Sequence, residues 1–123
     1  MIKILIADDH PDMRQVLTDT LQEEFPGLYI EEAVSTVQLL EKTLPAHWDI
    51  VISDLYMPGG GAFYFLEKIK AAGKKIPAII VLSMFPAAQY KQKVIEAGAS
   101  EFIEKDTLPL PLLKAIRKYL DKV

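Results

Sequence analysis

The sequence predicts an α/β protein, a doubly wound sandwich in which helices cover both faces of one parallel sheet. Short apolar runs rich in β-branched residues alternate with segments of helical periodicity along the whole chain. The alternation occurs five times, without an internal repeat, a low-complexity tract or a linker. Strands that alternate with helices form parallel sheets buried on both faces, and their crossovers are right-handed. We therefore expect one (βα)5 domain over residues 1–123.

The first strand and helix are expected at the N-terminus. Residues 2–7 form a β-branched run typical of a buried strand. Pro11 then stands at a favourable first helical position. Apolar residues, among them Val16, Leu17 and Leu21, recur at helical spacing until the Pro-Gly pair at residues 26–27 stops the helix.

The second strand and helix have weaker patterns. Residues 28–34 alternate imperfectly and contain two glutamates, which favours an edge strand over a central one. Ser35 can cap the helix that follows. We expect this helix to run to about Leu44, with Val37, Leu40 and Leu44 on its buried face.

The third unit begins with a strand at residues 49–53. The Met-Pro-Gly-Gly-Gly segment at residues 57–61 predicts a turn. A helix is expected over residues 63–72 and is closed by Gly73.

The last two units complete the pattern. Residues 78–82 are a continuous apolar run and predict a strand. The helix over residues 86–97 should end at Gly98 in the left-handed conformation. A short strand at residues 101–104 and a helix at residues 111–120 follow.

Composition excludes several classes of protein. The chain has 123 residues and is 50% hydrophobic, enough for one core without disulfides or a structural metal. It contains no cysteine, which excludes thiolate zinc clusters and cysteine nucleophiles. With 14 basic and 17 acidic residues, nothing indicates a nucleic-acid surface on this domain. No signal peptide or membrane span is apparent, so we expect a cytoplasmic protein without membrane contact.

Polar residues fall at the ends of the expected strands. The pair Asp8-Asp9 follows the first strand, Asp54 the third, Ser83 the fourth and Lys105 the fifth. In an open parallel sheet the carboxyl ends of the strands share one edge, and ligands bind there where the strand order reverses. These residues, far apart in sequence, are therefore predicted to converge.

Three carboxylates in one crevice need a cation. At an assumed separation of ~5 Å and an effective dielectric of ~20, each like-charged pair costs on the order of 3 kcal/mol. Mg²⁺ prefers oxygen ligands and often combines one or two carboxylates with a phosphate oxygen. Lys105 and Ser83 suit that phosphate as a cation and a hydroxyl donor. Asp54 is then a candidate nucleophile, because carboxylates can form acyl phosphates.

These motifs resemble the receiver family of response regulators in two-component signalling, whose fold is CheY-like. The resemblance covers essentially the whole chain and is carried by four segments in the expected order, Ile6-Ala7-Asp8-Asp9-His10, Ser53-Asp54-Leu55-Tyr56-Met57-Pro58-Gly59, Leu82-Ser83, and Gly98-Ala99-Ser100-Glu101-Phe102 leading to Lys105. It implies a flavodoxin-like sheet of order 2-1-3-4-5.

The resemblance implies a Mg²⁺-dependent phosphoacceptor site. Asp54 would be the phosphoacceptor and would also contact the metal. Asp9 would bind Mg²⁺ directly and Asp8 mostly through water, while the third protein ligand would be the backbone carbonyl of Tyr56. The donor would be a sensor histidine kinase or a phosphotransfer protein. Such a domain is a switch with weak self-catalysed phosphorylation and dephosphorylation, not an enzyme.

The resemblance also implies a conformational switch. Lys105 would pair with the phosphoryl group and Ser83 would hydrogen-bond it. Phe102 would then turn inward and change the face formed by the fourth helix, fifth strand and fifth helix. The Asp106-Thr107 pair resembles the subfamily with a C-terminal helix-turn-helix domain, which is absent here. Transcriptional output through DNA would then belong to that domain, and homodimer formation stays open.

Three positions depart from the family pattern. Met84 stands where Ala or Gly is usual, and it would either crowd the entrance to Asp54 and slow the chemistry or simply fill a gap. Gly61-Ala62 replaces an Asp-Gly pair, so the next helix loses an aspartate cap and its start should be looser. Phe102 lacks a tyrosine hydroxyl, so its inward state must be held by packing alone.

Other interpretations remain. A receiver whose chemistry has lapsed would keep the fold as a docking or dimerisation surface. A phosphatase with an aspartyl-phosphate intermediate needs an Asp-x-Asp spacing that Asp8-Asp9 does not provide, and a flavodoxin needs a hydroxyl-rich loop there. We interpret His10 as structural, His47 and Trp48 as packing residues, and the lysines of residues 68–75 as solvating a helix end.

Overall fold

Five strands and five α-helices alternate in the computed structural model, which describes residues 1–122. A short 3-10 helix, Lys105–Thr107, links the last strand to the last helix. The bounds are β1 Lys3–Ala7, α1 Pro11–Glu24, β2 Tyr29–Ala33, α2 Thr36–Thr43, β3 Ile50–Asp54, α3 Gly61–Ala71, β4 Ala78–Ser83, α4 Ala87–Glu96, β5 Glu101–Glu104 and α5 Leu110–Leu120.

The strands form one parallel sheet of order β2-β1-β3-β4-β5, which confirms the predicted fold class and strand order. β2, with its two glutamates, lies at an edge as its polar pattern predicted. The chain therefore starts near the middle of the sheet, crosses to one edge, returns past β1 and continues to the other edge at β5. The strand order reverses between β1 and β3, where a ligand crevice is expected.

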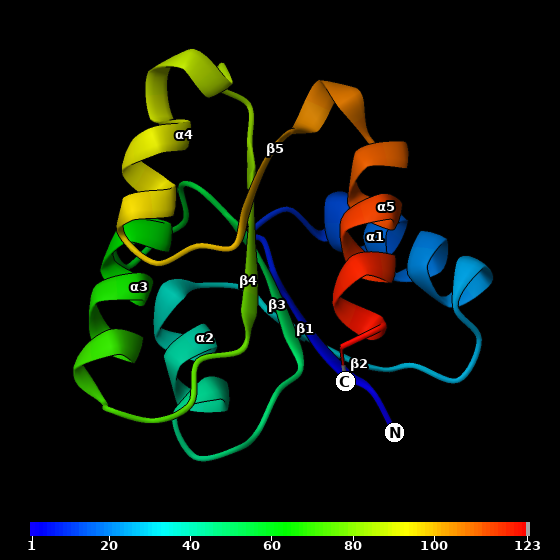
Figure 1. The fold of residues 1–123 in the computed structure, drawn as a ribbon, viewed down its shortest axis with the longest axis horizontal. Coiled ribbons are helices and arrows are strands. Elements are labelled where there is room, and N and C mark those ends of the chain that lie inside the picture. The colour runs from blue at the N-terminus through cyan, green and yellow to red at the C-terminus, as the bar shows by residue number, and fades with distance from the viewer. Residues whose placement is uncertain (123) are drawn as a thin grey trace.

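Helices cover both faces of the sheet. α1 and α5 lie together on one face, and α2, α3 and α4 lie on the other (Figure 1). The strands alternate between two hydrophobic clusters: Ile4 and Ile6 face the α1 and α5 side, whereas Leu5 and Ala7 face the opposite side. Both faces of the central strands are thus buried, which explains why their sequences are continuous apolar runs.

Most predicted boundaries agree with the structure to within two residues. Gly98 has a φ of +121°, which confirms that α4 is followed by a residue in the left-handed region. Ser35 is the N-cap of α2, and its hydroxyl accepts a hydrogen bond from the Gln38 amide at 3.2 Å. Trp48 is buried and its Nε1 donates to the Lys42 carbonyl at 2.8 Å, so it is a packing residue as expected.

The predicted buried face of α2 is partly wrong. Val37 is 59% exposed, whereas Leu39 is fully buried between Thr36 and Thr43 on the inward stripe. Both threonine hydroxyls are hydrogen-bonded inside the protein, the first to the Gly61 amide and the second to the Leu39 carbonyl. A hydroxyl group can be buried when its hydrogen bonds are formed inside the protein. Hydropathy alone therefore predicted the wrong buried face for α2. Val16 of α1 is likewise 59% exposed.

The expected looser start of α3 is not found. Gly60 is the N-cap and offers no side chain, but the Gly61 amide donates to Thr36 Oγ1 at 2.9 Å. A residue of α2 therefore supplies the cap that the sequence lacks locally. Gly61 itself has a φ of +70°, and a Cβ there would lie 2.5 Å from the Leu55 carbonyl oxygen. This tight approach requires glycine.

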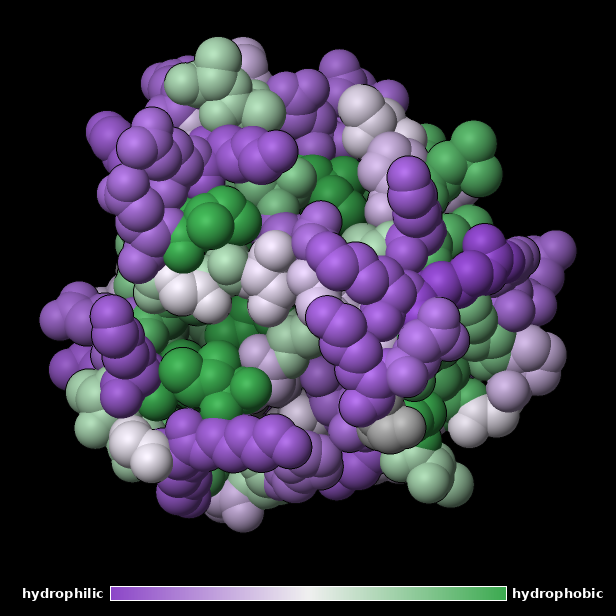
Figure 2. All heavy atoms as spheres, viewed as in Figure 1, coloured by the Kyte–Doolittle hydropathy of each residue, from purple (hydrophilic) through white to green (hydrophobic). Residues whose placement is uncertain are grey.

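Polar and charged residues cover much of the face seen in Figure 2. On the face seen in Figure 2, hydrophobic residues appear in small groups between charged side chains. Within residues 1–122, none of the helices has both the length and the apolar composition that crossing a bilayer would need.

Truncation of Leu39 should cost much more stability than truncation of Val37. Leu39→Ala removes fully buried methyl groups and should lower the free energy of unfolding by about 2–5 kcal/mol. Val37→Ala, on the exposed side of the same helix, should change it by less than about 0.5 kcal/mol. Urea unfolding followed by circular dichroism measures both, and equal effects would contradict the observed rotation of α2.

Candidate functional site

Strand register brings the predicted site residues to one edge of the sheet. Ala7 of β1 is paired with Ser53 of β3, so the residues that follow them, Asp8 and Asp54, are neighbours. Ser83 at the end of β4 is paired with Glu104, and Lys105 comes next along the chain. The convergence predicted from strand-end positions is therefore observed, and it results from parallel pairing without bulges.

Lys105 links two of the carboxylates. Its Nζ lies 3.1 Å from Asp8 Oδ2 and 3.1 Å from Asp54 Oδ2. All three side chains are at least nine-tenths buried. One ammonium group thus balances two carboxylates at the end of the sheet, and both ion pairs are shielded from solvent.

Asp8 and Asp9 occupy different environments. Asp8 is 1% exposed, and the Arg14 Nη1 donates to its backbone carbonyl at 2.8 Å. Arg14 is itself held by an ion pair with Glu32 at 2.8 Å. The Asp9 side chain is 33% exposed and is not paired with Lys105 among the described residues. Asp9 therefore has the carboxylate most open to an incoming cation.

His10 belongs to the cluster, although the sequence analysis assigned it only a structural role. Its Nδ1 lies 3.0 Å from Asp8 Oδ1 and 3.3 Å from Asp9 Oδ1. Its backbone amide also donates to Asp8 Oδ1 at 2.9 Å. The only signal in the sequence was adjacency to the acidic pair, which does not show where a ring points.

Burial dominates the electrostatics of Asp54. Burial raises the pKa of the Asp54 carboxyl; Lys105 offsets part of this increase, and the charges of Asp8 and Asp9 add to it. For Lys105, burial alone would lower the pKa, but the two facing carboxylates outweigh it and hold the pKa above its usual value. Lys105 therefore stays an ammonium ion, while Asp54 is held in a site that disfavours its charge.

Within residues 1–122, neither the Ser83 hydroxyl nor the Phe102 ring is hydrogen-bonded to Asp8, Asp54 or Lys105. The Ser83 hydroxyl is buried and accepts a hydrogen bond from the Phe85 amide at 2.8 Å. Phe102 is 8% exposed and belongs to the hydrophobic cluster under α2, α3 and α4. The ring that was expected to turn inward on activation is thus already inward in this structure.

An aromatic cluster that the sequence analysis missed covers the neighbouring loops. Tyr56, Phe85 and Tyr90 pack edge to face, with ring centroids 5.4–6.0 Å apart. The Tyr56 hydroxyl donates to the Tyr90 hydroxyl at 3.0 Å. Met84, between Ser83 and Phe85, is 76% exposed, so it does not fill a gap in the core. These rings tie the loops after β3 and β4 to α4.

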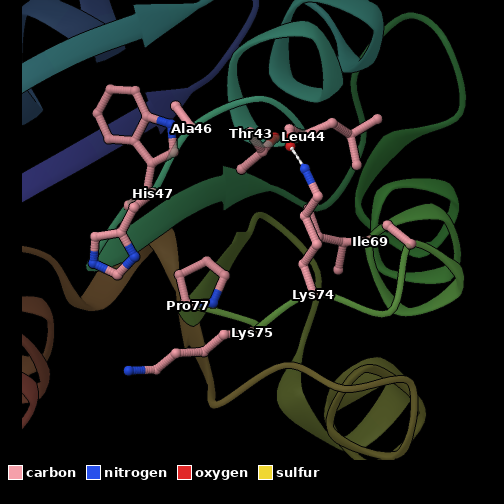
Figure 3. Close-up of a pocket in the computed structure, with 10 residues that line it drawn as sticks. Thr43, Leu44, Ala46, His47, Ile69, Lys74, Lys75 and Pro77 are labelled. Atoms are coloured by element: carbon pink, nitrogen blue, oxygen red, sulfur yellow. Dashed lines mark hydrogen bonds between the residues drawn. The ribbon is translucent and has the colours of Figure 1, made fainter.

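A separate hollow lies at the opposite end of β3. Its lining includes His47 and Lys75, and Figure 3 shows Lys74 directed at the Leu44 carbonyl. Trp48, which also lines it, precedes β3, whereas Asp54 ends that strand. None of the predicted site residues belongs to this hollow.

The acidic end of the sheet has a donor set that fits a hard divalent cation. Asp8, Asp9, His10 and Asp54 each offer one ligand atom, and these atoms all lie within 4.8 Å of one another. Carboxylate oxygens are the ligands that Mg²⁺ prefers. The arrangement thus combines a cation site, a buried carboxylate nucleophile and a fixed ammonium group, the parts that phosphoryl transfer to a carboxylate requires.

Comparison with known proteins identifies the family. A family model described as "Response regulator receiver domain" matches residues 4–117. The chain belongs to this family. As a receiver domain of two-component signalling with an acidic site, it is a phosphoacceptor and not an enzyme in the usual sense.

Individual receiver relatives agree with this assignment. The glycerol metabolism activator of Pseudomonas putida is 34% identical, over 98% of this chain and 55% of its own length. The sensor protein EvgS of Escherichia coli K12 is 32% identical, over 99% of this chain and 10% of its own. The response regulator TrrA of Thermotoga maritima, solved in complex with Mg²⁺-BeF, is 30% identical with a TM-score of 0.83, covering 97% of this chain and 99% of that one.

The chain spans only about half of the P. putida activator and a tenth of EvgS. The shared part is therefore one segment of each of these larger proteins. Activities of the remainder of those proteins do not carry over to this chain.

Neutralising Asp54 should stabilise the metal-free protein at pH 7. Because the pKa of Asp54 is raised, the folded state binds the proton more tightly than the unfolded chain does, and wild-type stability falls as pH rises through the raised folded value. The asparagine in Asp54→Asn does not titrate. The variant should therefore have a higher free energy of unfolding than wild type at pH 7, and this difference should vanish below the ordinary aspartate pKa of about 3.9. Urea unfolding in EDTA between pH 3 and 7 measures this difference and its loss.

Asp49→Asn provides a control of opposite sign. Burial raises the pKa of Asp49, but the Lys3 amide and His47 outweigh burial, and the pKa is lowered overall. This variant should be less stable than wild type at pH 7, and the deficit should shrink as pH falls through the lowered folded value. A loss of stability in both variants at pH 7 would contradict the environment described for Asp54.

Proposed function

We propose that this receiver domain takes a phosphoryl group on Asp54, in a Mg²⁺-dependent transfer from a histidine kinase or a phosphotransfer protein. The observation that carries the proposal is the position of Lys105 Nζ, 3.1 Å from both Asp8 and Asp54 at the carboxyl edge of the sheet. An ammonium group held there is positioned to meet the oxygens of a phosphoryl group attached to Asp54.

The transfer is a displacement at phosphorus. A carboxylate oxygen of Asp54 forms the new P–O bond while the P–N bond of a phosphohistidine donor breaks, and its electron pair returns to the imidazole nitrogen. The surrounding residues mainly position the groups and offset charge, because the transition state is loose and spreads its charge over the phosphoryl oxygens. Lys105 exchanges part of its contact with Asp54 for contact with those oxygens.

Asp8, Asp9, Asp54 and the backbone carbonyl of Tyr56 would hold the metal. The hard oxygen donors within 4.8 Å support this assignment for the three carboxylates, and the Mg²⁺-BeF complex of the T. maritima relative supports the choice of ion. When bound, Mg²⁺ would neutralise the carboxylates and the developing phosphoryl charge. Asp9, the most exposed of the three, would be a direct ligand, whereas Asp8, already engaged by Lys105, would act mostly through water.

Ser83 would convert phosphorylation into a change of shape. To donate to a phosphoryl oxygen, its hydroxyl must give up the hydrogen bond that it donates to the Phe85 carbonyl at 3.2 Å, so the loop after β4 would rearrange. Phe102 is already inward, so it would take part by staying packed in the core, since its ring has no hydroxyl to bond there. Exposed Met84 lies in the same loop and would move with it. The face of α4, β5 and α5 would then change for a partner.

Partners follow from the family. The sensor protein EvgS and the sensor histidine kinase RcsC of Escherichia coli K12 each contain a segment related to this chain, which supports a phosphorelay partner. The P. putida activator, a longer relative, supports a transcriptional output through a DNA-binding domain outside this chain, with no nucleic-acid contact by the receiver itself. A homodimer through the switched face would deliver such an output to paired DNA sites.

Incubation with Mg²⁺ and acetyl phosphate or phosphoramidate should add one phosphoryl mass to the wild-type protein. Asp54→Asn should abolish the addition, because the carboxylate nucleophile is gone. Lys105→Ala should slow it by about a hundredfold or more, because a preorganised charge at the phosphoryl oxygens is lost. Intact-mass spectrometry over time measures all three proteins.

Asp49→Asn is the matched control, because Asp49 is a largely buried carboxylate at the other end of β3. It should be phosphorylated at the wild-type rate once circular dichroism shows that it is folded. Phosphorylation of Asp54→Asn at the wild-type rate would contradict the acceptor assignment. A wild-type protein that gains no mass would instead indicate a receiver kept only as a docking surface.

A further inference from the structure

The Nδ1 atom of His10 points toward the carboxylates of Asp8 and Asp9, two residues of the proposed metal site. Asp8 Oδ2 is engaged by Lys105, so its other oxygen, Oδ1, faces His10 Nδ1 at 3.0 Å. Asp9 Oδ1 lies 3.3 Å from the same nitrogen. The same Asp8 oxygen also accepts a hydrogen bond from the His10 backbone amide at 2.9 Å, which holds it in place.

One of these distances matches an edge of a coordination polyhedron. Two ligand atoms bonded to the same octahedral ion at about 2.1 Å, and at right angles, lie roughly 3.0 Å apart. The distance of 3.3 Å from Nδ1 to Asp9 Oδ1 is close to one such edge, whereas the 3.0 Å from Nδ1 to Asp8 Oδ1 is also a hydrogen-bond distance. A single ion can therefore bind His10 and Asp9 directly with small side-chain adjustments, while Asp8 acts mostly through water.

We propose that His10 is a further metal ligand and that it makes this receiver favour first-row transition ions over Mg²⁺. This proposal rests on the metal site proposed above. Imidazole suits Co²⁺, Ni²⁺ and Zn²⁺, whereas Mg²⁺ prefers oxygen and gains little from a nitrogen ligand. His10 thus sets metal selectivity beside the oxygen donors of Asp8, Asp9 and Asp54.

To bind a metal, Nδ1 must exchange its hydrogen bond with Asp8 Oδ1 for the ion; because a carboxylate only accepts, that bond places the ring proton on Nδ1 in the metal-free protein. Metal binding at Nδ1 requires the tautomer with its proton on Nε2. The His10 side chain is 69% exposed, and Nε2 has no hydrogen-bond partner within residues 1–122, so water can accept that proton's hydrogen bond. Burial of Asp8 beneath the ring keeps the carboxylate from turning away from the ion.

Titration of the metal-free protein with Co²⁺ and, separately, with Mg²⁺ tests the proposal. Isothermal titration calorimetry gives both affinities, and the visible bands of Co²⁺ report nitrogen coordination. His10→Ala should weaken Co²⁺ binding by about tenfold or more without weakening Mg²⁺ binding, and the Co²⁺ bands should shift. His10→Gln, which keeps a polar side chain, should behave like His10→Ala and guards against a folding defect in either variant.

His47→Ala is the matched control, because His47 is the second of the two histidines and contacts Asp49 at the other end of the sheet. It should leave Co²⁺ affinity at the acidic site and the visible spectrum unchanged. Equal losses of Co²⁺ and Mg²⁺ affinity in both His10 variants, or unchanged Co²⁺ binding, would overturn the proposal.

Failure of the proposed function would look different. It would appear as a wild-type protein that gains no phosphoryl mass in Mg²⁺, whatever the result with Co²⁺. A wild type that is phosphorylated in Mg²⁺ but whose Co²⁺ spectrum is the same in the His10 variants would reject only the role of His10.

Discussion

Lys105 shares one ammonium group between two buried carboxylates, and the carboxyl edge of the sheet depends on that charge balance. At a separation of 3.1 Å and an effective dielectric of ~20, each contact provides about 5 kcal/mol of attraction. Removal of the three groups from water costs several kcal/mol per ion, so little net stabilisation remains. The attraction between the charges and the cost of removing them from water nearly cancel. A cation or a phosphoryl group added at this edge can therefore rearrange the Lys105 contacts at a small cost in free energy.

The rigid sheet keeps these charges together. Parallel pairing without bulges places the ends of β1 and β3 side by side, and both strands are buried on both faces. The side chains that would move on phosphorylation lie instead in the loops after β3 and β4. There the Ser83 hydroxyl is bonded to Phe85, and the rings of Tyr56, Phe85 and Tyr90 join these loops to α4. A change at Asp54 would therefore be transmitted through loops and α4, with the strands as a fixed base.

Prediction from the sequence succeeded where a residue's role follows from its position in a repeating pattern. The strands, their edge and central placement, and the convergence of Asp8, Asp54 and Lys105 follow from strand periodicity and the geometry of parallel sheets. It failed where burial depended on a distant partner. Thr36 is buried because its hydroxyl caps α3 from α2, and that bond turned Val37 outward.

The sequence by itself determined the fold class, the strand order through the family resemblance, and the end of the sheet where the charges meet, since these depend on local periodicity and strand direction. Only the tertiary structure decided how each side chain is directed: His10 toward the acids, Ser83 toward Phe85 and Phe102 into the core. The reason is physical. Backbone pairing is repetitive and readable from pattern, whereas a side chain's direction depends on hydrogen-bond partners and packing neighbours brought from elsewhere in the chain.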